Sequence, residues 1–540
     1  MLLSFAEVQV NDPKFILALN KGENMNFERT VVFGDFHGDL DIMLASLADK
    51  GLIRYNGELD DVIEKIKNSI NDSLPLETMV IAQKQVVRVV FLGDFLDRYQ
   101  LAYHIIQFVE KIRWEDFGIY PIFLIGNHDL LNFHFFVNPF ELADIYQGSG
   151  HSKSDTISYI NSMGLDRSLE SFMALHSEEI VNRQVRFYET GTLEYQEAGY
   201  TVQYQYPFDF SPLARYRLTD GDYNAYYHKI VQALELKNLL TEKTTIKGLH
   251  DLRYVLSKQL GELTIGKAQR NWWEISINPD DWDSRYDSSI SHVNLFSKEM
   301  DEGKIEILPI DWRVISLVWR HHYGNYFRRT RLLHHEGNTL FVHAGISPLA
   351  MIDPLVFGNI YDLCHDTFRA LKSECRKDVS VETLVNRSNR LFGQILENAL
   401  NDYSFKRMSG AEVFDQIGYW RGGMVDGLPI FGGPVWIDFH YLQRCVGEDK
   451  KLQSLYQAFK EATGIDRILC GHTHFQLSEK PEVRFLKSEE FEKIGIEYLC
   501  VDNGCSKAYS RGTVVINGIE IDKAGQIVGQ GEISSASKYW

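Results

Sequence analysis

Paired cysteines are missing from this sequence of 540 residues. Its six cysteines stand at positions 364, 375, 445, 470, 500 and 505, and none forms a CxxC pair. Cys470 and Cys500 fall in apolar, strand-like runs. The spacing therefore favours reduced, buried thiols in a reducing compartment.

An excess of basic residues and a long apolar run at the start are also missing. The 56 Lys and Arg residues are outnumbered by 74 Asp and Glu residues, which gives a net charge of −18. That charge disfavours nonspecific attraction to nucleic acid or to anionic membranes. The first residues, MLLSFAEVQVNDPKF, are apolar only briefly, lack a basic segment and include Glu7. We therefore expect a cytoplasmic protein with no secretory signal, no membrane span and no nucleic-acid partner.

What the sequence does contain is a set of five polar clusters, each placed just after an apolar run. They are GDFHGD at 34–39, GDFLDR at 93–98, GNHD at 126–129, HAG at 343–345 and GHTH at 471–474. The runs before them are rich in β-branched and aromatic residues, which is typical of buried strands. The clusters would then lie at the carboxyl ends of strands, where α/β folds build their sites.

The side chains in these clusters match the chemistry of a two-metal site. Two cations about 3.5–4 Å apart can share a hydroxide and neutralise the charge of a phosphoryl group. The clusters supply oxygen and imidazole ligands without sulfur, a set that suits Mn, Fe or Zn. The candidate ligands are Asp35, His37, Asp94, Asn127, His343, His472 and His474. Each cluster alone is an ordinary turn signal, but all five in this order favour a metal site.

At these residues the chain resembles the calcineurin-like metallophosphoesterase superfamily and, within it, the phosphoprotein phosphatase type. The resemblance implies two divalent metal ions, with Mn favoured over Fe or Zn. It implies that one ion is held by Asp35, His37, Asp94 and His474. The second would be held by Asp94, Asn127, His343 and His472, so that Asp94 bridges the two ions.

The GDFLDR segment carries the likeness to the protein phosphatases. By that resemblance Arg98 clamps the phosphate, and His128 protonates the leaving oxygen while Asp97 orients it. A guanidinium fork suits phosphate oxygens, and an imidazole held by a carboxylate is a reasonable general acid near neutral pH. A second phosphate-binding arginine is expected between the last two clusters. We choose Arg421, whose alternative is a solvated surface arginine.

Four features depart from the protein phosphatase pattern. Tyr99 follows the Asp-Arg pair where a glycine is usual, Asp129 follows the catalytic histidine where glutamate is favoured, and Ala344 interrupts a His-Gly-Gly segment. His474 completes a Gly-His-x-His motif that eukaryotic protein phosphatases generally lack and other metallophosphoesterases keep. The superfamily is thus indicated more strongly than the subfamily.

The spacing of the clusters predicts the domain organisation. The family resemblance implies an α/β fold, a four-layer α/β/β/α sandwich. Because the clusters run from residue 34 to residue 474, this fold should include segments from most of the chain. Far more residues separate His128 from His343 than one crossover needs. We expect a discontinuous catalytic core at 25–135 and 336–530 and an inserted, substrate-selecting cap at 136–335. The alternative is that the aromatic residues of this insertion only fill a core of their own.

Several helices are predicted from apolar periodicity. These are 40–52, 102–114, 381–399 and a basic, aromatic run at 319–335. The last run contains His321 and His322, followed by His334 and His335. Neighbours in sequence do not share a helix face, so these four histidines were not counted as ligands.

Three functions fit the sequence. The first is a phosphomonoesterase of protein phosphatase type, which hydrolyses phosphorylated Ser, Thr or Tyr in a protein by attack of a metal-bridging hydroxide. The second uses the same metals on small phosphoanhydrides or diesters, such as diadenosine tetraphosphate or cyclic nucleotides. The third is a scaffold without catalysis, whose usual mark is a missing ligand, and here none is missing.

Overall fold

The computed structural model covers residues 1–540, of which a large part is described here. The described residues are 27–55, 57–68, 80–82, 86–98, 101–112, 114–137, eight helical positions between 165 and 183, 192–197, 200–205, 292–293, 310–347, 380–401, 422–425, 428–431, 433–473, 485–502 and 518–528. Most of the predicted cap lies outside them. Among the described residues no helix has the length and apolar character needed to cross a membrane.

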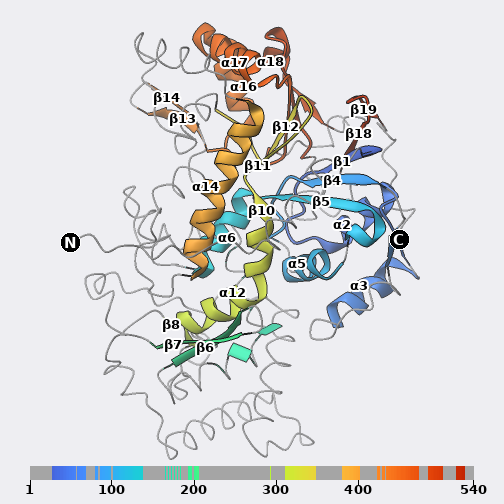
Figure 1. Ribbon diagram of the computed structural model, residues 1–540, viewed down its shortest axis with the longest axis vertical. Coiled ribbons are helices and arrows are strands. Elements are labelled where there is room, and N and C mark those ends of the chain that lie inside the picture. Colours follow the sequence, from blue (N-terminus) through green and yellow to red (C-terminus); the bar gives the residue numbers. More distant parts are fainter. Residues whose placement is uncertain are drawn as a thin grey trace, which may run out of the picture.

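Two β-sheets form the centre of the fold (Figure 1). The first has the strand order β10-β5-β4-β1-β18-β19, and its first four strands are parallel. The bounds are β10 Thr330–Arg331, β5 Ile119–Leu124, β4 Val87–Phe91, β1 Arg29–Phe33, β18 Ile519–Asp522 and β19 Ile527–Val528. The next strand, β18, pairs antiparallel with β1, although almost the whole chain separates them, and β19 forms the edge.

The second sheet has the order β11-β12-β15-β17-β16, in which β12, β15 and β17 are parallel. The bounds are β11 Leu333–Glu336, β12 Thr339–Val342, β15 Arg467–Cys470, β17 Glu497–Cys500 and β16 Leu486–Lys487. Four two-stranded ribbons complete the described strands. They are β2 Ile53–Tyr55 with β3 Val80–Ala82, β6 Thr192–Glu197 with β7 Tyr200–Gln205, β8 His292–Val293 with β9 Ile310–Asp311, and β13 Gly422–Val425 with β14 Leu428–Phe431.

The pattern of burial along β4 shows why the sheets stack. All five of its residues are buried, so both of its faces are covered. Val87, Val89 and Phe91 pack into the larger core, whereas Val90 belongs to a second, separate apolar cluster. Since side chains alternate along a strand, these are its two faces. The second cluster combines side chains from both sheets: Val32, Val90, Leu92, Ile122, Leu124, Phe341, Leu469, Leu499, Val501, Ile519 and Ile521.

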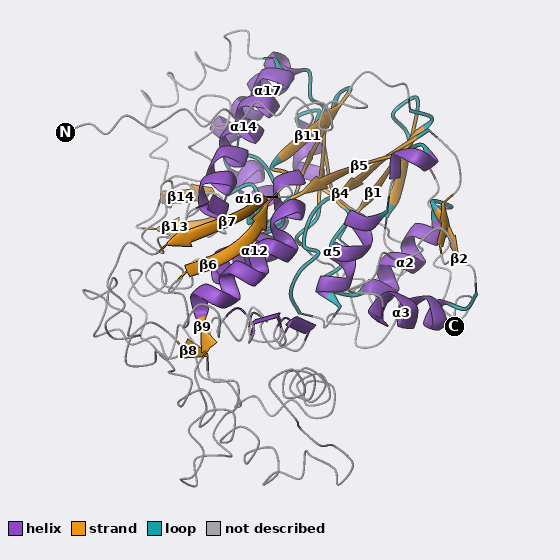
Figure 2. Cartoon of the chain, turned by 60° about the horizontal axis from the view of Figure 1, so that its bottom comes forward, coloured by secondary structure: helices purple, strands orange, loops and turns teal. Residues whose placement is uncertain are grey.

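Helices form the outer layers (Figures 1 and 2). The first sheet is covered by α2 Leu40–Asp49, α3 Leu59–Asn68 and α5 Ala102–Lys111, and the second by α16 Phe439–Glu448, α17 Lys450–Thr463 and α18 Glu489–Lys493. The remaining described elements are α6 Asn127–Val137, α12 Trp312–Arg329, α14 Val381–Asn401 and the 3₁₀ turn Trp114–Phe117. This is the predicted four-layer α/β/β/α sandwich.

The helix predicted at 319–335 ends earlier than expected. The run at 319–335 was expected to be helical throughout, but α12 spans Trp312–Arg329 and the chain then enters β10 and β11. Residues 330–331 pair with β5 and residues 333–336 pair with β12, so this short segment contributes to both sheets. Tertiary strand pairing overrides the local periodicity here.

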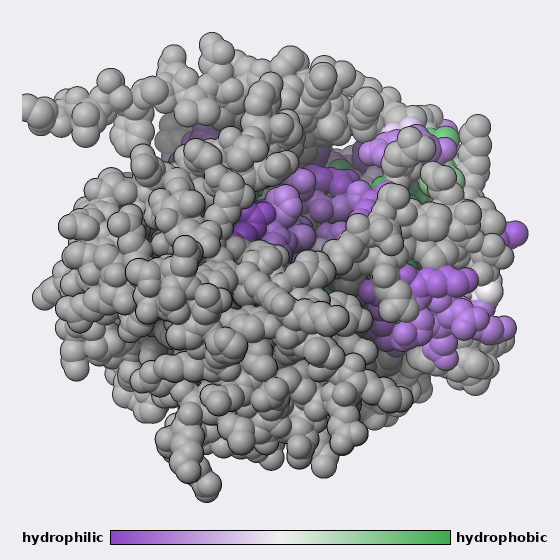
Figure 3. Space-filling model, turned by 90° about the horizontal axis from the view of Figure 1, so that it is seen from below, coloured by the Kyte–Doolittle hydropathy of each residue, from purple (hydrophilic) through white to green (hydrophobic). Residues whose placement is uncertain are grey.

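The described surface is polar, and the three described cysteines are free thiols. On the face in Figure 3, the described residues are mainly hydrophilic. Among the described residues, the large apolar side chain that is exposed is Val528. Cys445, Cys470 and Cys500 are free thiols, and the last two are buried on neighbouring strands.

Candidate metal centre

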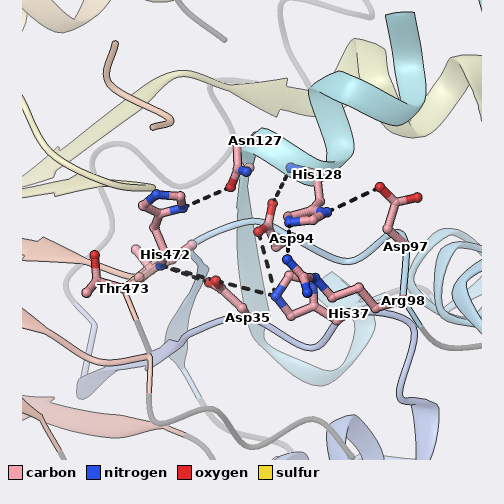
Figure 4. Close-up of polar contacts among 12 residues, drawn as sticks. Asp35, His37, Asp94, Asp97, Arg98, Asn127, His128, His472 and Thr473 are labelled. Carbon is pink, nitrogen blue, oxygen red and sulfur yellow. Dashed lines mark hydrogen bonds and ion pairs between the residues drawn. The ribbon is translucent and has the colours of Figure 1, made fainter. Parts of the chain in front are cut away.

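The polar clusters converge at the carboxyl ends of strands from both sheets. The first three clusters follow β1, β4 and β5, and the last two follow β12 and β15. Figure 4 shows Asp35, His37, Asp94, Asn127 and His472 pointing toward one another. The structure therefore brings together segments that stand more than four hundred residues apart in sequence.

Backbone contacts hold the first three loops against each other. The N–H groups of Phe36 and His37 both donate to the carbonyl of Asp94, at 3.2 and 2.8 Å. A Cβ atom on Gly126 would lie 2.0 Å from Asp94 Oδ1, and one on Gly471 would lie 2.5 Å from Asp35 Oδ1. Both clusters therefore need glycine, because it lets backbone approach a carboxylate.

The loops hold an unusual backbone conformation. Among the described residues, the non-glycine residues with positive φ are five, and all lie in these loops. They are His37 at 47°, Asp94 at 54°, Asp97 at 70°, Arg98 at 62° and His472 at 66°. Left-handed backbone at side-chain-bearing residues costs on the order of 1–3 kcal/mol each and collects at functional sites.

The donor atoms around Asn127 fit a cation. His343 Nδ1 donates to the carbonyl of Leu92 at 2.8 Å, and burial lowers the pKa of His343 to about 3. The ring is therefore neutral, and its Nε2 carries a lone pair. That atom lies 3.0 Å from Asn127 Oδ1 and 3.5 Å from Asp94 Oδ2, both of which are acceptors. Lone pairs that face one another in this way suit a metal ion between them.

Two groups of potential ligands share Asp94. The first group consists of Asp94, His343 and His472, and the second consists of Asp94, His37 and His128. Within each group, the potential ligand atoms all lie within 4.8 Å of one another. Asp35 borders the second group, with Oδ2 at 3.9 Å from His37 Nε2. The shared carboxylate has the position that a bridging ligand requires.

Negative charge is concentrated at this point. Asp35 and Asp94 are almost completely buried. Burial raises the pKa of Asp35 well above its usual value, and the charges of Asp502 and Asp94 raise it further. Burial and the charge of Asp129 do the same to Asp94, whereas the charge of Arg98 acts in the opposite direction. Divalent cations would stabilise the ionised form of these carboxylates.

His128 lies between an acid and a guanidinium. Its Nδ1 is 3.3 Å from Asp97 Oδ2, and its Nε2 is 3.0 Å from an Arg98 nitrogen. A guanidinium can only donate, so Nε2 accepts from Arg98 and Nδ1 donates to Asp97. The predicted acid, its orienting carboxylate and the predicted phosphate clamp are therefore in contact.

Further residues, inside and outside the sequence motifs, support this arrangement. Asn132 Nδ2 and Ser168 Oγ donate to Asp97 Oδ1, at 2.8 and 2.5 Å. The carboxylate of Asp129 accepts from four backbone N–H groups, those of Asp94, Phe95, Leu96 and Gly126. Burial raises the pKa of Asp129 to about 6, and these backbone hydrogen bonds limit the rise. Asn132, five residues beyond Asn127 on α6, could have been suspected from sequence, but Ser168 could not.

Two predicted site residues lie outside the described part of the chain. They are His474, the last histidine of the GHTH cluster, and Arg421, the predicted second phosphate ligand. Asp39, the second aspartate of GDFHGD, is the N-cap of α2 and accepts from the Ile42 N–H. It therefore has a structural role and not a ligand role.

Comparison with known families gives the decisive observation. The family model of the calcineurin-like phosphoesterases matches residues 28–284. Residues 28–284 belong to this family. As a calcineurin-like phosphoesterase the chain is a metal-dependent phosphoric ester hydrolase. The match ends before His343 and His472, which the fold brings to the same point as the matched motifs.

Comparisons with individual proteins give only remote similarity. A cold-active protein tyrosine phosphatase solved at 1.1 Å shares 12% identity, with a TM-score of 0.31, over 93% of this chain and 78% of that one. A cold-active protein tyrosine phosphatase from a psychrophilic Shewanella species shares 11%, with a TM-score of 0.32, over 93% and 80%. No curated protein matches the sequence.

Proposed function

We propose that this calcineurin-like phosphoesterase is a dinuclear enzyme that hydrolyses phosphate monoesters, with phosphorylated protein side chains as substrates. One ion would be held by Asp35, His37, Asp94 and His474, and the other by Asp94, Asn127, His343 and His472, with Mn favoured over Fe or Zn. The observation that carries the proposal is the contact of Arg98 and His128 beside the carboxylate of Asp94.

The residues of the chain divide the work. When bound, the cations would activate the attacking water and neutralise charge on the phosphoryl group. Arg98 would grip the free phosphate oxygens. Once Nε2 of His128 is free and has taken up a proton from solvent, it would donate that proton to the leaving oxygen, while Asp97 would hold the other ring nitrogen. Because Arg98 occupies Nε2 in this structure, binding of phosphate would draw the guanidinium away and free that nitrogen.

The first experiment separates an acid from a ligand at His128. His128 also lies in the group with His37 and Asp94, so it could instead bind a metal. We expect His128→Asn to keep both ions and to slow hydrolysis of alkyl phosphates by about 10²–10⁴-fold. Aryl phosphates, whose leaving groups need less protonation, should be slowed less. The control is His440→Asn on the exposed face of α16. Loss of one ion from His128→Asn would reassign the residue as a ligand.

The second experiment separates monoesters from small diesters and anhydrides. Arg98→Ala removes charge-assisted hydrogen bonds of about 1.5–3 kcal/mol each, so turnover of phosphopeptides should fall at least about tenfold with both ions retained. Arg444→Ala, an exposed change on α16, is the control. The complete GHTH motif favours the alternative class of substrate. An enzyme that prefers dinucleoside polyphosphates or cyclic nucleotides to phosphopeptides with Mn bound would contradict the proposal.

A further inference from the structure

A second cluster of potential ligands lies away from the Asp94 centre. It consists of His176, Glu179 and His322, whose ligand atoms are all within 4.8 Å of one another. His322 lies on α12, and the other two are helical residues of the insertion. His176 and Glu179 are three residues apart, so they share one helix face. The cluster therefore joins the helical residues at 176 and 179 to α12.

His176 is the residue that most needs a partner. It is 5% exposed, and its ring lies 4.0 Å from that of His322, 4.6 Å from that of Tyr103 and 4.7 Å from that of Phe172, between centroids. Its Nε2 has no hydrogen-bond partner among the described residues. A buried polar atom without a partner costs about 1–3 kcal/mol, and an ion at this point would remove that cost.

Glu179 directs one carboxylate oxygen, Oε2, at His322 within the cluster. Oε1 accepts from Arg183 Nε at 2.7 Å, while Oε2 faces His322 Nε2 at 2.7 Å. Burial alone would raise the pKa of Glu179, but the hydrogen bonds and charges of His322 and Arg183 outweigh it and lower that pKa to about 2. The carboxylate is thus ionised at any physiological pH and is fixed on one side.

His322 has the second contact that a ligating histidine usually has. Its Nδ1 lies 3.1 Å from the hydroxyl of Tyr103 on α5. Metal-bound imidazoles commonly donate their other N–H to such an oxygen, which fixes the ring. In this structure Nε2 donates to Glu179 Oε2; with an ion bound, Nδ1–H would donate to the Tyr103 hydroxyl, and Nε2 would turn its lone pair to the ion.

We propose that His176, Glu179 and His322 form a third metal site, which binds a borderline divalent cation such as Zn²⁺ and fastens the helical residues at 176 and 179 to α12. Two imidazoles and one carboxylate are a common zinc donor set. Ligands of a tetrahedral zinc at about 2.0–2.1 Å lie about 3.3 Å apart, so the contact between Glu179 and His322 lengthens by about 0.6 Å on binding. This site does not depend on the proposed function.

The site has a consequence for catalysis. Ser168, which donates to Asp97, is a described helical residue eight positions before His176 in the sequence. Fastening His176 and Glu179 to α12 therefore holds Ser168 against the carboxylate that orients His128. The three ligands act as positioning residues and not as catalytic ones.

The test counts zinc per chain in the full-length protein. The wild type and variants are stripped with a chelator, incubated with Zn²⁺, freed of excess ion and analysed by inductively coupled plasma mass spectrometry. We expect His176→Gln and His322→Gln each to hold one zinc fewer than the wild type. The matched control is His321→Gln, an exposed neighbour on α12, which should hold the wild-type number. Equal zinc in all four proteins would overturn the site.

A difference of one ion identifies this site whatever the Asp94 centre binds, so the zinc count tests the site even if the proposed function is wrong.

The second measurement needs no variant. Crystals of the wild type grown with Zn²⁺ should show an anomalous peak at the zinc edge between His176, Glu179 and His322. A map with these side chains ordered and no peak there would leave only a Glu–His hydrogen bond and refute the proposal.

Discussion

Glu110 on α5 gives the sharpest test of the electrostatics of the core. Burial raises the pKa of Glu110 from 4.5 to about 7, and the charge of Arg329 limits the rise. Below pH 4.5 the carboxyl is neutral in both the folded and the unfolded chain. Between pH 4.5 and 7 the unfolded chain loses the proton first, so the free energy of unfolding falls as pH rises. Above pH 7 the loss is complete.

The size of this loss follows from the shift in pKa. Each unit corresponds to about 1.4 kcal/mol, so the shift from 4.5 to about 7 sets an upper limit of about 3.5 kcal/mol. Since Glu110 is partly exposed, we expect about 1–3 kcal/mol. Glu110→Gln cannot ionise, so it should match the wild type at pH 4.5 and exceed it by that amount at pH 8.

The assay is urea unfolding of the wild type and Glu110→Gln at both pH values, followed by fluorescence. Glu115→Gln, on the exposed 3₁₀ turn nearby, is the control and should differ from the wild type by less than about 0.5 kcal/mol. The reasoning is refuted if the free energies of unfolding of Glu110→Gln and the wild type differ by the same amount at pH 4.5 and pH 8. It is also refuted if the wild type is the more stable protein at pH 8.

Three further predictions concern the site and the core. Gly471→Ala places a Cβ 2.5 Å from Asp35 Oδ1 and should abolish metal binding at the Asp94 centre, which metal analysis checks. Its matched control, Gly393→Ala, has open space around the new Cβ in α14 and should stabilise the protein by up to about 1 kcal/mol, which thermal unfolding checks. Leu499→Ala, in the apolar layer between the sheets, should lower the free energy of unfolding by about 2–5 kcal/mol, and a urea curve close to that of the wild type would contradict the layer. Ser168→Ala removes one hydrogen bond to a carboxylate, worth about 1.5–3 kcal/mol, and should slow alkyl phosphate turnover about tenfold or more with unchanged metal content; unchanged turnover would show that Ser168 does not support the acid.

The sequence was most informative where strand and cluster follow each other directly. Apolar runs such as Thr30–Phe33 form buried strands. The polar residues after them lie at the strand ends because they directly follow the strands in the sequence. Helix α2 was predicted at 40–52 and ends at Asp49, and α14 was predicted at 381–399 and ends at Asn401. Local periodicity defines such elements well and their ends less well.

Contacts between distant segments could not be predicted in this way. His322 was set aside because adjacent histidines point in different directions, and that rule is correct for His321 and His322 as a pair. It does not predict that His176, which is distant in sequence, packs against His322. The same holds for Ser168 beside Asp97. The division into a core and a cap at 136–335 stays a prediction, since most of that insertion lies outside the described residues.

The positive φ angles at His37, Asp94, Asp97, Arg98 and His472 have a consequence for how such a protein changes under selection. Glycine adopts this backbone without strain, so replacing any of these residues by glycine would relieve strain and remove a functional side chain in one step. A screen for heat resistance alone would therefore enrich variants that have lost turnover. Variants of this chain that are freed from the need to hydrolyse phosphate could therefore lose this strain together with the functional side chains.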